Sequence, residues 1–340
     1  MIKVKKGHRI YEINIKEFLD LIGREYRLKF KPDFSVIDEG EVNLHLIIED
    51  KLQKFAVRVF RDDKTLADIN SDLFLLKSLN ESNFPTPKIF ATKNNKLFVK
   101  YQNYPVSIFE YIDGTIPKYN VKTFQKLGSD LAMLHSFQNK IKIKESGLYN
   151  RGNRITEMKK LIKNHLKELE IYCEEPTFSV IKETYDKIKN LKFNDCKRGL
   201  IHGDVVFHNL KQTKNGKIYF LDFDDAGIGP LILDFVLPIC YECTNFNRIK
   251  PDIRDLELNR NLLKAYLKGY FKTKKFSHSE IEKLWDACGF RIMDFIYWMI
   301  WRIINDKKEM DSKIIDHWKL FLFLKDIYPR IKKEVLNFNN

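Results

Sequence analysis

The pattern of apolar positions along the chain predicts short strands in its first third. Residues 42–49 and 55–61 are rich in β-branched and other apolar residues, as strands usually are. The polar stretch 50–53 between them is typical of a hairpin connection. Three further short segments also have strand character, namely residues 89–91, 97–101 and 107–112.

Helical periodicity dominates the remainder of the chain. One helix is predicted inside the strand-rich part over residues 63–80, where apolar residues at 66, 69, 73, 76 and 79 fall on one face. Another is expected before the first strand, over residues 10–30. The later helices are predicted over residues 120–138, 153–170, 176–190, 258–272, 279–305 and 311–337.

These elements predict an α+β fold with two lobes. A length of 340 residues exceeds what a single simple core usually holds. Gly114 and Pro117 mark the crossover. We therefore expect a small β-rich lobe over residues 1–112, carrying an extra N-terminal helix, and a larger, mostly helical lobe over residues 113–340.

The charge of the chain leaves its partners open. The formal net charge is +14, with 31% charged and 44% hydrophobic residues, which is an ordinary globular mixture apart from its basic balance. Such a balance can indicate a nucleic acid, a membrane surface or an anionic substrate, or a lysine-rich composition spread over solvated surfaces. The basic cluster at residues 3–9 lacks the interleaved aromatic residues of a single-strand binder. We expect neither a nucleic-acid nor a membrane partner.

The cysteines and apolar segments favour a reducing cytoplasm. Cys240 and Cys243 form the one close pair among five cysteines, and no second pair completes a zinc site. Two buried thiols explain them better than a redox pair. The N-terminus has no apolar signal-peptide region. The most apolar late segment, residues 290–304, is interrupted by Arg291 and Asp294, so we expect a buried helix.

The most informative segment is residues 200–234. Two short strands, 210–212 and 218–221, are separated by a turn that contains Asn215 and Gly216, a strong hairpin signal. A two-residue turn at this dipeptide would place Asn209 opposite Asp222. Oxygen ligands that close together can share a Mg²⁺ ion.

The same segment resembles the aminoglycoside phosphotransferase and choline kinase-like family, which has a bilobal protein kinase-like fold. The resemblance is carried by His202-Gly203-Asp204, by Asn209 five residues later and by the run Leu221-Asp222-Phe223-Asp224-Asp225. The Leu127-Gly128 pair and the Leu131-Ala132-x-Leu134-His135 stretch match the helix that opens the family's large lobe. The run 222–230 with Asp234 is closest to the group of bacterial stress response kinase A.

The resemblance implies a role for each residue of this motif. Asp204 is the expected catalytic carboxylate, which orients the acceptor hydroxyl and takes its proton. His202 is expected to brace the catalytic loop. Asn209 and Asp222 are expected to hold Mg²⁺ on the phosphates of ATP or GTP. Asp234 matches a buried aspartate that ties down the metal-binding loop.

The resemblance also implies nucleotide-binding residues in the small lobe. Arg58 stands where the family carries a phosphate-binding cation, and we expect it to pair with Asp72 on the helix at 63–80. Two unrelated surface charges are the alternative interpretation. Gly40 and Asn43 match a sparse phosphate-binding loop. The backbone groups of Glu110 and Ile112 match the hinge that holds adenine.

The acceptor of the phosphate is the least determined part of this hypothesis. The resemblance implies a hydroxyl acceptor, and a net charge of +14 makes the chain a poor general attractor for cationic aminoglycosides. An unspecified small-molecule alcohol or a protein Ser/Thr is therefore favoured. Candidate contacts in the large lobe, which a buried aromatic helix face would also explain, are Tyr241, Glu242, Asp294, Trp298, Trp301 and Arg302.

The leading hypothesis is thus a Mg·ATP-dependent phosphotransferase. A pseudokinase-like nucleotide-binding scaffold is the alternative, because Arg58, Asp72 and the sparse glycine loop depart from the common pattern. A nucleic-acid binder would rest on net charge alone and would show steep salt dependence.

Overall fold

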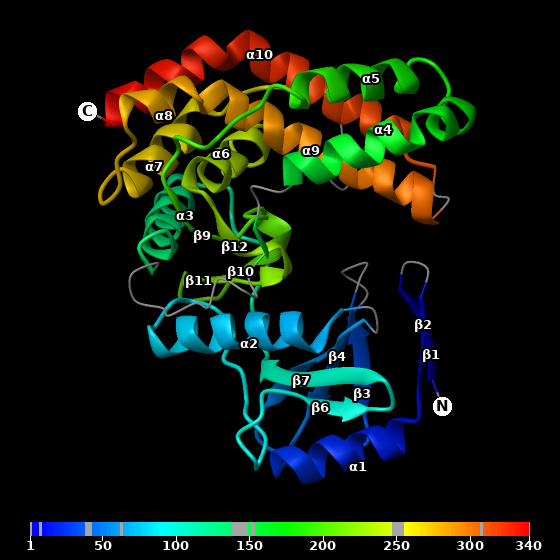
Figure 1. Ribbon diagram of the computed structural model, residues 1–340. Helices are drawn as coiled ribbons and strands as arrows, with labels where there is room; N and C mark the ends of the chain where they lie inside the picture. The colour runs from blue at the N-terminus through cyan, green and yellow to red at the C-terminus, as the bar shows by residue number, and fades with distance from the viewer. Residues whose placement is uncertain are drawn as a thin grey trace. The chain divides into compact units, whose positions relative to one another are not determined.

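The computed structural model describes residues 2–6, 9–37, 43–61, 64–137, 149–150, 154–246, 255–306 and 309–339. They form two compact units (Figure 1). The first consists mainly of Met1–Thr115 and Lys211–Asp224, and the second contains most of the remaining chain.

The first unit is built on a five-stranded antiparallel sheet with the strand order β3-β4-β5-β7-β6. Leu44, Leu46 and Ile48 alternate with less buried residues along β4, so one face of the strand enters the core. The predicted segment 89–91 contributes only a bridge between Ile89 and Phe109. The strands are β3 (Phe34–Ile37), β4 (Leu44–Glu49), β5 (Lys54–Val59), β6 (Val99–Tyr101) and β7 (Tyr104–Glu110).

The helix predicted over residues 63–80 is α2 (Leu66–Glu81). It begins after Thr65, whose side chain accepts a hydrogen bond from the backbone N–H of Asp68. Lys64 therefore lies one residue before the N-cap of α2.

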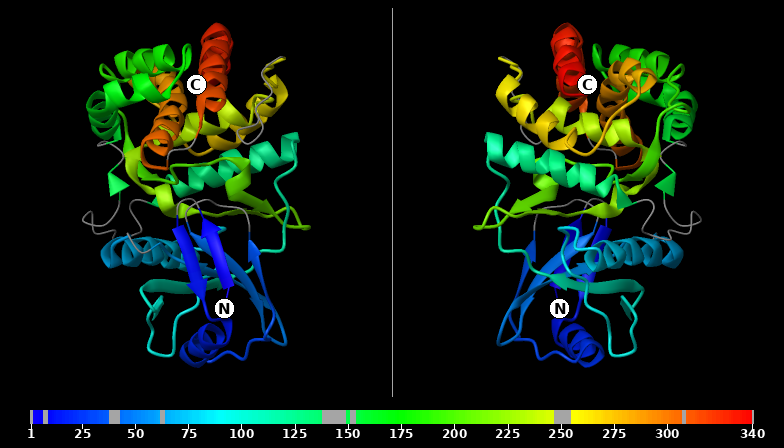
Figure 2. Two further views of the ribbon diagram at one scale, coloured as in Figure 1. Left: turned by 90° about the vertical axis from the view of Figure 1, so that its right-hand side faces the viewer. Right: turned by 90° about the vertical axis from the view of Figure 1, so that its left-hand side faces the viewer.

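The N-terminal segment differs from the expected helix over residues 10–30. Strands β1 (Ile2–Lys6) and β2 (Arg9–Ile13) form a hairpin, which Figure 2 shows in dark blue, and helix α1 covers only Ile15–Tyr26. Tyr11 and Ile13 are buried and two residues apart, which is strand periodicity. Asn14 caps the helix by accepting from the N–H of Glu17, and this cap separates strand from helix.

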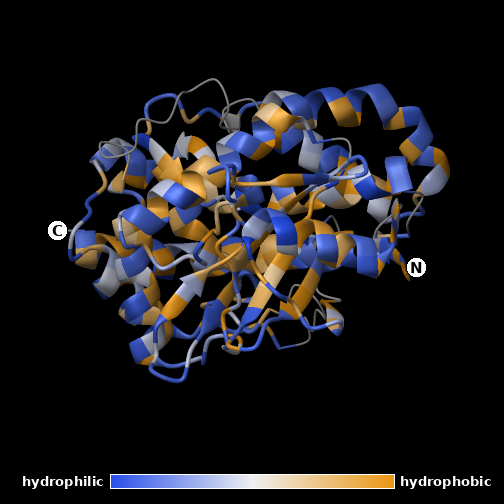
Figure 3. Ribbon diagram, turned by 90° about the horizontal axis from the view of Figure 1, so that it is seen from below, coloured by the Kyte–Doolittle hydropathy of each residue, from blue (hydrophilic) through white to orange (hydrophobic). Residues whose placement is uncertain are grey.

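The second unit is mostly helical and contains a small sheet with the order β8-β12-β9. Along its helices, hydrophobic and hydrophilic positions alternate, as expected for helices with one buried face (Figure 3). Its strands are β8 (Tyr149–Asn150), β9 (Arg198–Ile201) and β12 (Gly227–Pro230). Its helices are α3 (Val121–Leu134), α4 (Arg154–Tyr172), α5 (Thr177–Ile188), α6 (Leu231–Tyr241), α7 (Arg260–Tyr270), α8 (His278–Glu282), α9 (Leu284–Asp306) and α10 (Asp311–Asn339).

Helices α3 and α7 pack closely against each other, and two glycines permit it. A Cβ atom on Gly128 would lie 2.1 Å from the carbonyl oxygen of Tyr266, and one on Gly269 would lie 2.0 Å from that of Gln125. Any side chain at either position would therefore push the two backbones apart.

The mixed α+β class is confirmed, and the differences lie at element boundaries. The helix predicted over residues 279–305 is divided at Lys283 into α8 and α9. Helix α6, apolar all round, was not predicted, because a fully buried helix has no amphipathic period. All five cysteines are free and buried, as expected for Cys240 and Cys243. Among the described residues, no helix is long and apolar enough to cross a membrane.

Candidate active site

The loop after β9 carries the predicted catalytic residues and is anchored through its backbone. The carboxylate of Asp234, in the first turn of α6, accepts hydrogen bonds from the N–H of His202 at 2.7 Å and from that of Gly203 at 2.8 Å. Gly203 has φ of +87°, a conformation that glycine adopts without strain. His202 accepts a further bond, from the N–H of Asp204 to its Nδ1 at 3.3 Å. These hydrogen bonds therefore fix the backbone of residues 202–204, and with it the position of Asp204.

Asp234 is itself held by a buried histidine. His135 Nε2 lies 3.3 Å from Asp234 Oδ2, and His135 Nδ1 lies 2.8 Å from the hydroxyl of Tyr270. Burial opposes ionisation of Asp234, but the hydrogen bond and charge of His135 outweigh it and lower its pKa. Asp234 thus stays a carboxylate, which is the form that accepts two backbone N–H bonds.

The carbonyl of Gly203 is held from the opposite direction by Arg291 on α9. The Nη2 group of Arg291 donates to this carbonyl, and its Nη1 donates to Asp294 Oδ2 at 2.9 Å. Both side chains are buried. Asp294 was predicted as an acceptor contact, and the structure instead places it in the support of the catalytic loop.

The predicted catalytic carboxylate and the predicted metal ligand of the same loop are in contact. Asn209 Nδ2 donates to the carbonyl of Asp204 at 3.0 Å and to Asp204 Oδ2 at 2.8 Å. Because the amide nitrogen is directed to Asp204, the amide oxygen Oδ1 is the atom that Asn209 can offer to a cation.

The hairpin between β10 (Leu210–Gln212) and β11 (Ile218–Phe220) forms as predicted, but its turn is different. Gly216 N–H donates to the carbonyl of Thr213 at 2.8 Å, and Thr213 N–H donates to the carbonyl of Lys217 at 3.0 Å. This is a three-residue turn in which Gly216, with φ of +84°, supplies the left-handed position. The register that placed Asn209 opposite Asp222 is therefore wrong by one residue.

Asp222 follows β11 with a strained backbone. Its φ is +53°, in the left-handed region that aspartate seldom occupies outside functional loops. Its side chain is half exposed, with Oδ1 3.5 Å from Arg58 Nη2. Its carboxylate offers the hard oxygen atoms that Mg²⁺ prefers.

The expected pair of Arg58 and Asp72 is replaced by a longer network. Arg58 Nη2 donates to Asp224 Oδ2, and Asp72 instead accepts from Lys64. Lys64 Nζ also lies 3.1 Å from Asp224 Oδ1. The pairing prediction is wrong because Asp72 pairs with Lys64, a residue that sequence periodicity does not indicate, and Arg58 pairs with Asp224.

The predicted phosphate loop and hinge are only partly described. Gly40 lies outside the described residues, and Asn43 Nδ2 donates to Asp224 Oδ2 at 2.9 Å. In the hinge, the N–H of Glu110 donates to the carbonyl of Lys88 at 2.8 Å, so this N–H is already engaged and does not point to adenine. Ile112 lies two residues beyond the end of β7 with its side chain buried.

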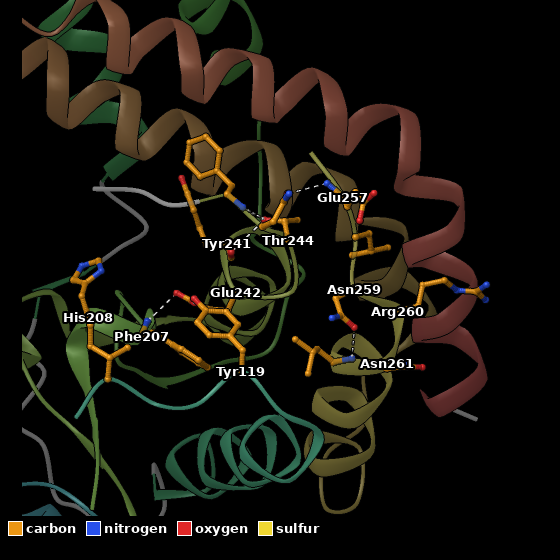
Figure 4. Close-up of a pocket in the computed structure, with 15 residues that line it drawn as sticks. Tyr119, Phe207, His208, Tyr241, Glu242, Thr244, Glu257, Asn259, Arg260 and Asn261 are labelled. Atoms are coloured by element: carbon orange, nitrogen blue, oxygen red, sulfur yellow. Dashed lines mark hydrogen bonds between the residues drawn. The ribbon is translucent and has the colours of Figure 1, made fainter. Parts of the chain in front are cut away.

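The second unit contains a cavity of about 770 Å³ beside the catalytic loop. Phe207 and His208, which follow Asp204, form part of its wall. Figure 4 shows Tyr119, Phe207 and Glu242 on one side of the cavity and Glu257, Asn259 and Asn261 on the other. Tyr241 and Glu242, both predicted acceptor contacts, line it, whereas none of the four predicted residues of α9 does so among the described lining residues.

The electrostatics of this cavity are set by Glu242. Its carboxylate accepts from the Tyr119 hydroxyl at 2.6 Å and from the N–H of Phe207 at 2.8 Å. Burial, together with the charge of Glu242, raises the pKa of Tyr119, so this hydroxyl remains a donor. Arg260 directs its guanidinium away from the cavity to Glu334, at 2.5 Å (Figure 4). The wall around Glu242 is therefore acidic and aromatic.

Arg302 and Trp298 are not part of that wall. Arg302 pairs with Asp306 one turn along α9, and its guanidinium lies 5.0 Å from the Trp298 ring centre. The described contacts of Arg302 are therefore with other residues of α9.

Sequence reasoning missed Lys64, Asp224, Tyr119, His135 and Arg291 as members of these networks. His135 and Asp224 do stand inside the motifs that carried the resemblance, and their position was the available signal. No comparable local signal marks Lys64, Tyr119 or Arg291, because their partners are distant in the chain.

Comparison with known proteins supports the kinase-like fold. A family model described as the phosphotransferase enzyme family matches residues 33–276. The solved structure of amicoumacin kinase hAmiN in complex with AMP-PNP, Ca²⁺ and Ami is similar at 15% identity and a TM-score of 0.67, covering 95% of this chain and 93% of that one. A microcompartment-associated aminopropanol kinase is similar at 16% identity and a TM-score of 0.67, covering 94% of this chain and 99% of that one.

Choline kinase from Cryptosporidium parvum is similar at 15% identity and a TM-score of 0.62, covering 91% of this chain and 93% of that one. No curated protein sequence matches the chain. At these identities the solved structures establish the fold, which confirms the kinase-like architecture expected from the motif.

Proposed function

The chain belongs to the phosphotransferase enzyme family, and from this premise we propose that it transfers the γ-phosphate of Mg·ATP to a hydroxyl group of a small molecule. The observation that carries the proposal is the contact between Asn209 and Asp204 on a loop anchored by Asp234. Phosphoryl transfer depends mainly on positioning and on charge neutralisation, and a rigid loop serves the first of these.

Asp204 acts on the acceptor in this proposal. Its carboxylate orients the acceptor hydroxyl and takes its proton as that oxygen bonds to the γ-phosphorus, while the bond from this phosphorus to the bridging oxygen breaks and ADP leaves. The hydrogen bond from Asn209 to Asp204 Oδ2 fixes the orientation of this carboxylate. His202, held between the loop backbone and the core, supports this position without contacting the reacting atoms.

Asn209 Oδ1 and the carboxylate of Asp222 are the proposed ligands of Mg²⁺. Their fit rests on the half-exposed side chain and left-handed backbone of Asp222, together with the amide orientation of Asn209. When bound, the metal would neutralise charge on the nucleotide phosphates. Arg58, buried beside Asp222, is the proposed phosphate-binding cation.

An alcohol that carries an amino group is the proposed acceptor. Glu242 and Glu257 give the cavity negative charge, and Tyr119, Phe207 and Tyr241 give it aromatic faces that can hold an ammonium group. This local acidity outweighs the overall charge of +14, on which sequence reasoning had ranked aminoglycosides low. Two similar structures are named as kinases of aminopropanol and choline, both nitrogen-bearing alcohols.

The reaction is tested by Asp204→Asn with an ATP-consumption assay over a panel of amino alcohols and their amine-free counterparts. We expect a loss of about a hundredfold or more in rate. Binding of ATP should be retained, and Asp186→Asn, at an exposed surface position, is the matched control. Full activity of Asp204→Asn would refute the assignment, whereas a wild-type protein that binds ATP without transferring phosphate to any member of the panel would support the nucleotide-binding scaffold.

The acceptor class is tested by Glu242→Gln, which keeps an oxygen for Tyr119 but removes the charge. We expect KM for an amino alcohol to rise about tenfold, as for loss of one charge-assisted contact, with KM for ATP unchanged. An equal effect on amine-free alcohols would contradict an ammonium-binding role.

A further inference from the structure

Three donors of the first unit converge on one carboxylate. Asp224 Oδ2 accepts from Arg58 Nη2 and from Asn43 Nδ2, the latter at 2.9 Å, and its Oδ1 lies 3.1 Å from Lys64 Nζ. The Asp224 carboxylate therefore holds the cations of Arg58 and Lys64 next to each other.

We propose that Lys64 is a second phosphate-binding cation, which acts with Arg58 on the nucleotide. Asp224 bridges the two side chains, so Lys64 Nζ is held next to the guanidinium assigned to phosphate binding. The inference rests on the proposed phosphotransferase function and adds a residue that the motif does not contain.

Lys64 keeps a donor for a ligand. It has three N–H donors and uses two of them, on Asp72 and Asp224. Its side chain is 11% exposed, so the third N–H can donate to a phosphate oxygen.

The charges around Lys64 match this role. Arg58 and Lys64 face the carboxylates of Asp72, Asp222 and Asp224, which gives a formal charge of −1 for the cluster. A divalent metal on Asp222 would change this sum to +1, which attracts an anionic phosphate. Without Lys64 the formal charge of the same cluster would be −2, and a divalent metal would bring it only to zero.

A positioning role is the competing explanation, because Lys64 also pairs with Asp72 on α2. In that case Lys64 would act by holding the helix, and removing either member of the pair would have the same effect. In a phosphate-binding role the two removals change ADP affinity in opposite directions. Loss of Lys64 weakens binding, whereas loss of Asp72 does not, because Asp72 carries the charge that partly neutralises Lys64.

The experiment measures the affinity of the full chain for adenosine and for ADP by calorimetry, in the presence of Mg²⁺. Lys64→Met should leave adenosine affinity unchanged and weaken ADP at least about tenfold, the loss expected for a charge-assisted hydrogen bond. Lys64→Arg should restore most of the ADP affinity. Lys77→Met, on the exposed side of α2 with Glu81 as its partner, should change neither ligand.

Asp72→Asn separates the two roles. Binding of ADP to this variant should be as tight as to the wild type or tighter, since a neighbouring anion is removed. Equal losses in Lys64→Met and Asp72→Asn, or an unchanged ADP affinity in Lys64→Met, would overturn the inference while leaving phosphotransfer intact. If the wild type bound neither ligand, the proposed function and this inference would both be wrong.

Discussion

The sharpest structural prediction concerns Arg291 on α9, which donates a hydrogen bond to the carbonyl of Gly203 in the predicted catalytic loop. Arg291→Met keeps an aliphatic chain of similar length but removes the donor to Gly203 and the cation beside Asp294. Both side chains of the ion pair are only 6% exposed. Removing one member of a buried pair costs about 3–5 kcal/mol of unfolding free energy.

Asp294→Asn should cost a similar amount, and the double variant much less than the sum. With both charges absent, no uncompensated ion is left in the core, so we expect a coupling of about 2 kcal/mol. Urea denaturation of the four proteins gives this value. Costs that add to within about 0.5 kcal/mol would show that the two side chains do not interact as described.

Catalysis should respond to Arg291 separately from stability. Because Gly203 immediately precedes Asp204, a displaced carbonyl should lower kcat about tenfold to a hundredfold at a temperature where the variant is folded, with little effect on KM for ATP. Arg302→Met removes a comparable buried pair with Asp306 on the same helix, away from this loop, and should destabilise without lowering kcat. An equal fall in kcat for both variants would refute the loop-positioning role.

Two further predictions concern packing and pH. Gly128→Ala should lower the unfolding free energy by about 3 kcal/mol, measured by denaturation, because its Cβ would meet the rigid carbonyl of Tyr266. Gly289→Ala should cost less, because its Cβ would meet only side-chain atoms, of which the nearest is a Phe321 ring atom at 3.3 Å. Equal costs would contradict the tight contact of α3 and α7. Burial raises the pKa of Asp72 to about 6, from an ordinary value of 3.8, so the folded state binds this proton more tightly than the unfolded state. The stabilisation from this proton is therefore complete below about pH 4 and is lost as the pH rises through 6. The unfolding free energy of Asp72→Asn should consequently rise by about 2–3 kcal/mol relative to that of the wild type between pH 4 and 7. A difference that stays constant over this range would contradict the prediction.

Local sequence determined the elements of this protein wherever the signal was periodic. The strands β4 and β5 and the helix α2 appear within a few residues of their predicted bounds, because burial of one face selects period-2 or period-3.6 patterns. The motif from His202 to Asp222 was also readable, since loop chemistry requires particular residues at fixed spacing. The prediction failed at the N-terminus, where a helix was expected over residues 10–30 but strand β2 of a short hairpin directly precedes helix α1.

Partner choice was decided by the tertiary structure. Arg58 and Asp224 are separated by 166 residues and Arg291 and Gly203 by 88, and no local pattern couples such positions. An ion pair depends on which opposite charge lies within reach after folding, so Lys64 could take Asp72 from Arg58. Sequence alone therefore predicted which residues carry the chemistry, and the packing of distant segments decided which of them hold one another in place.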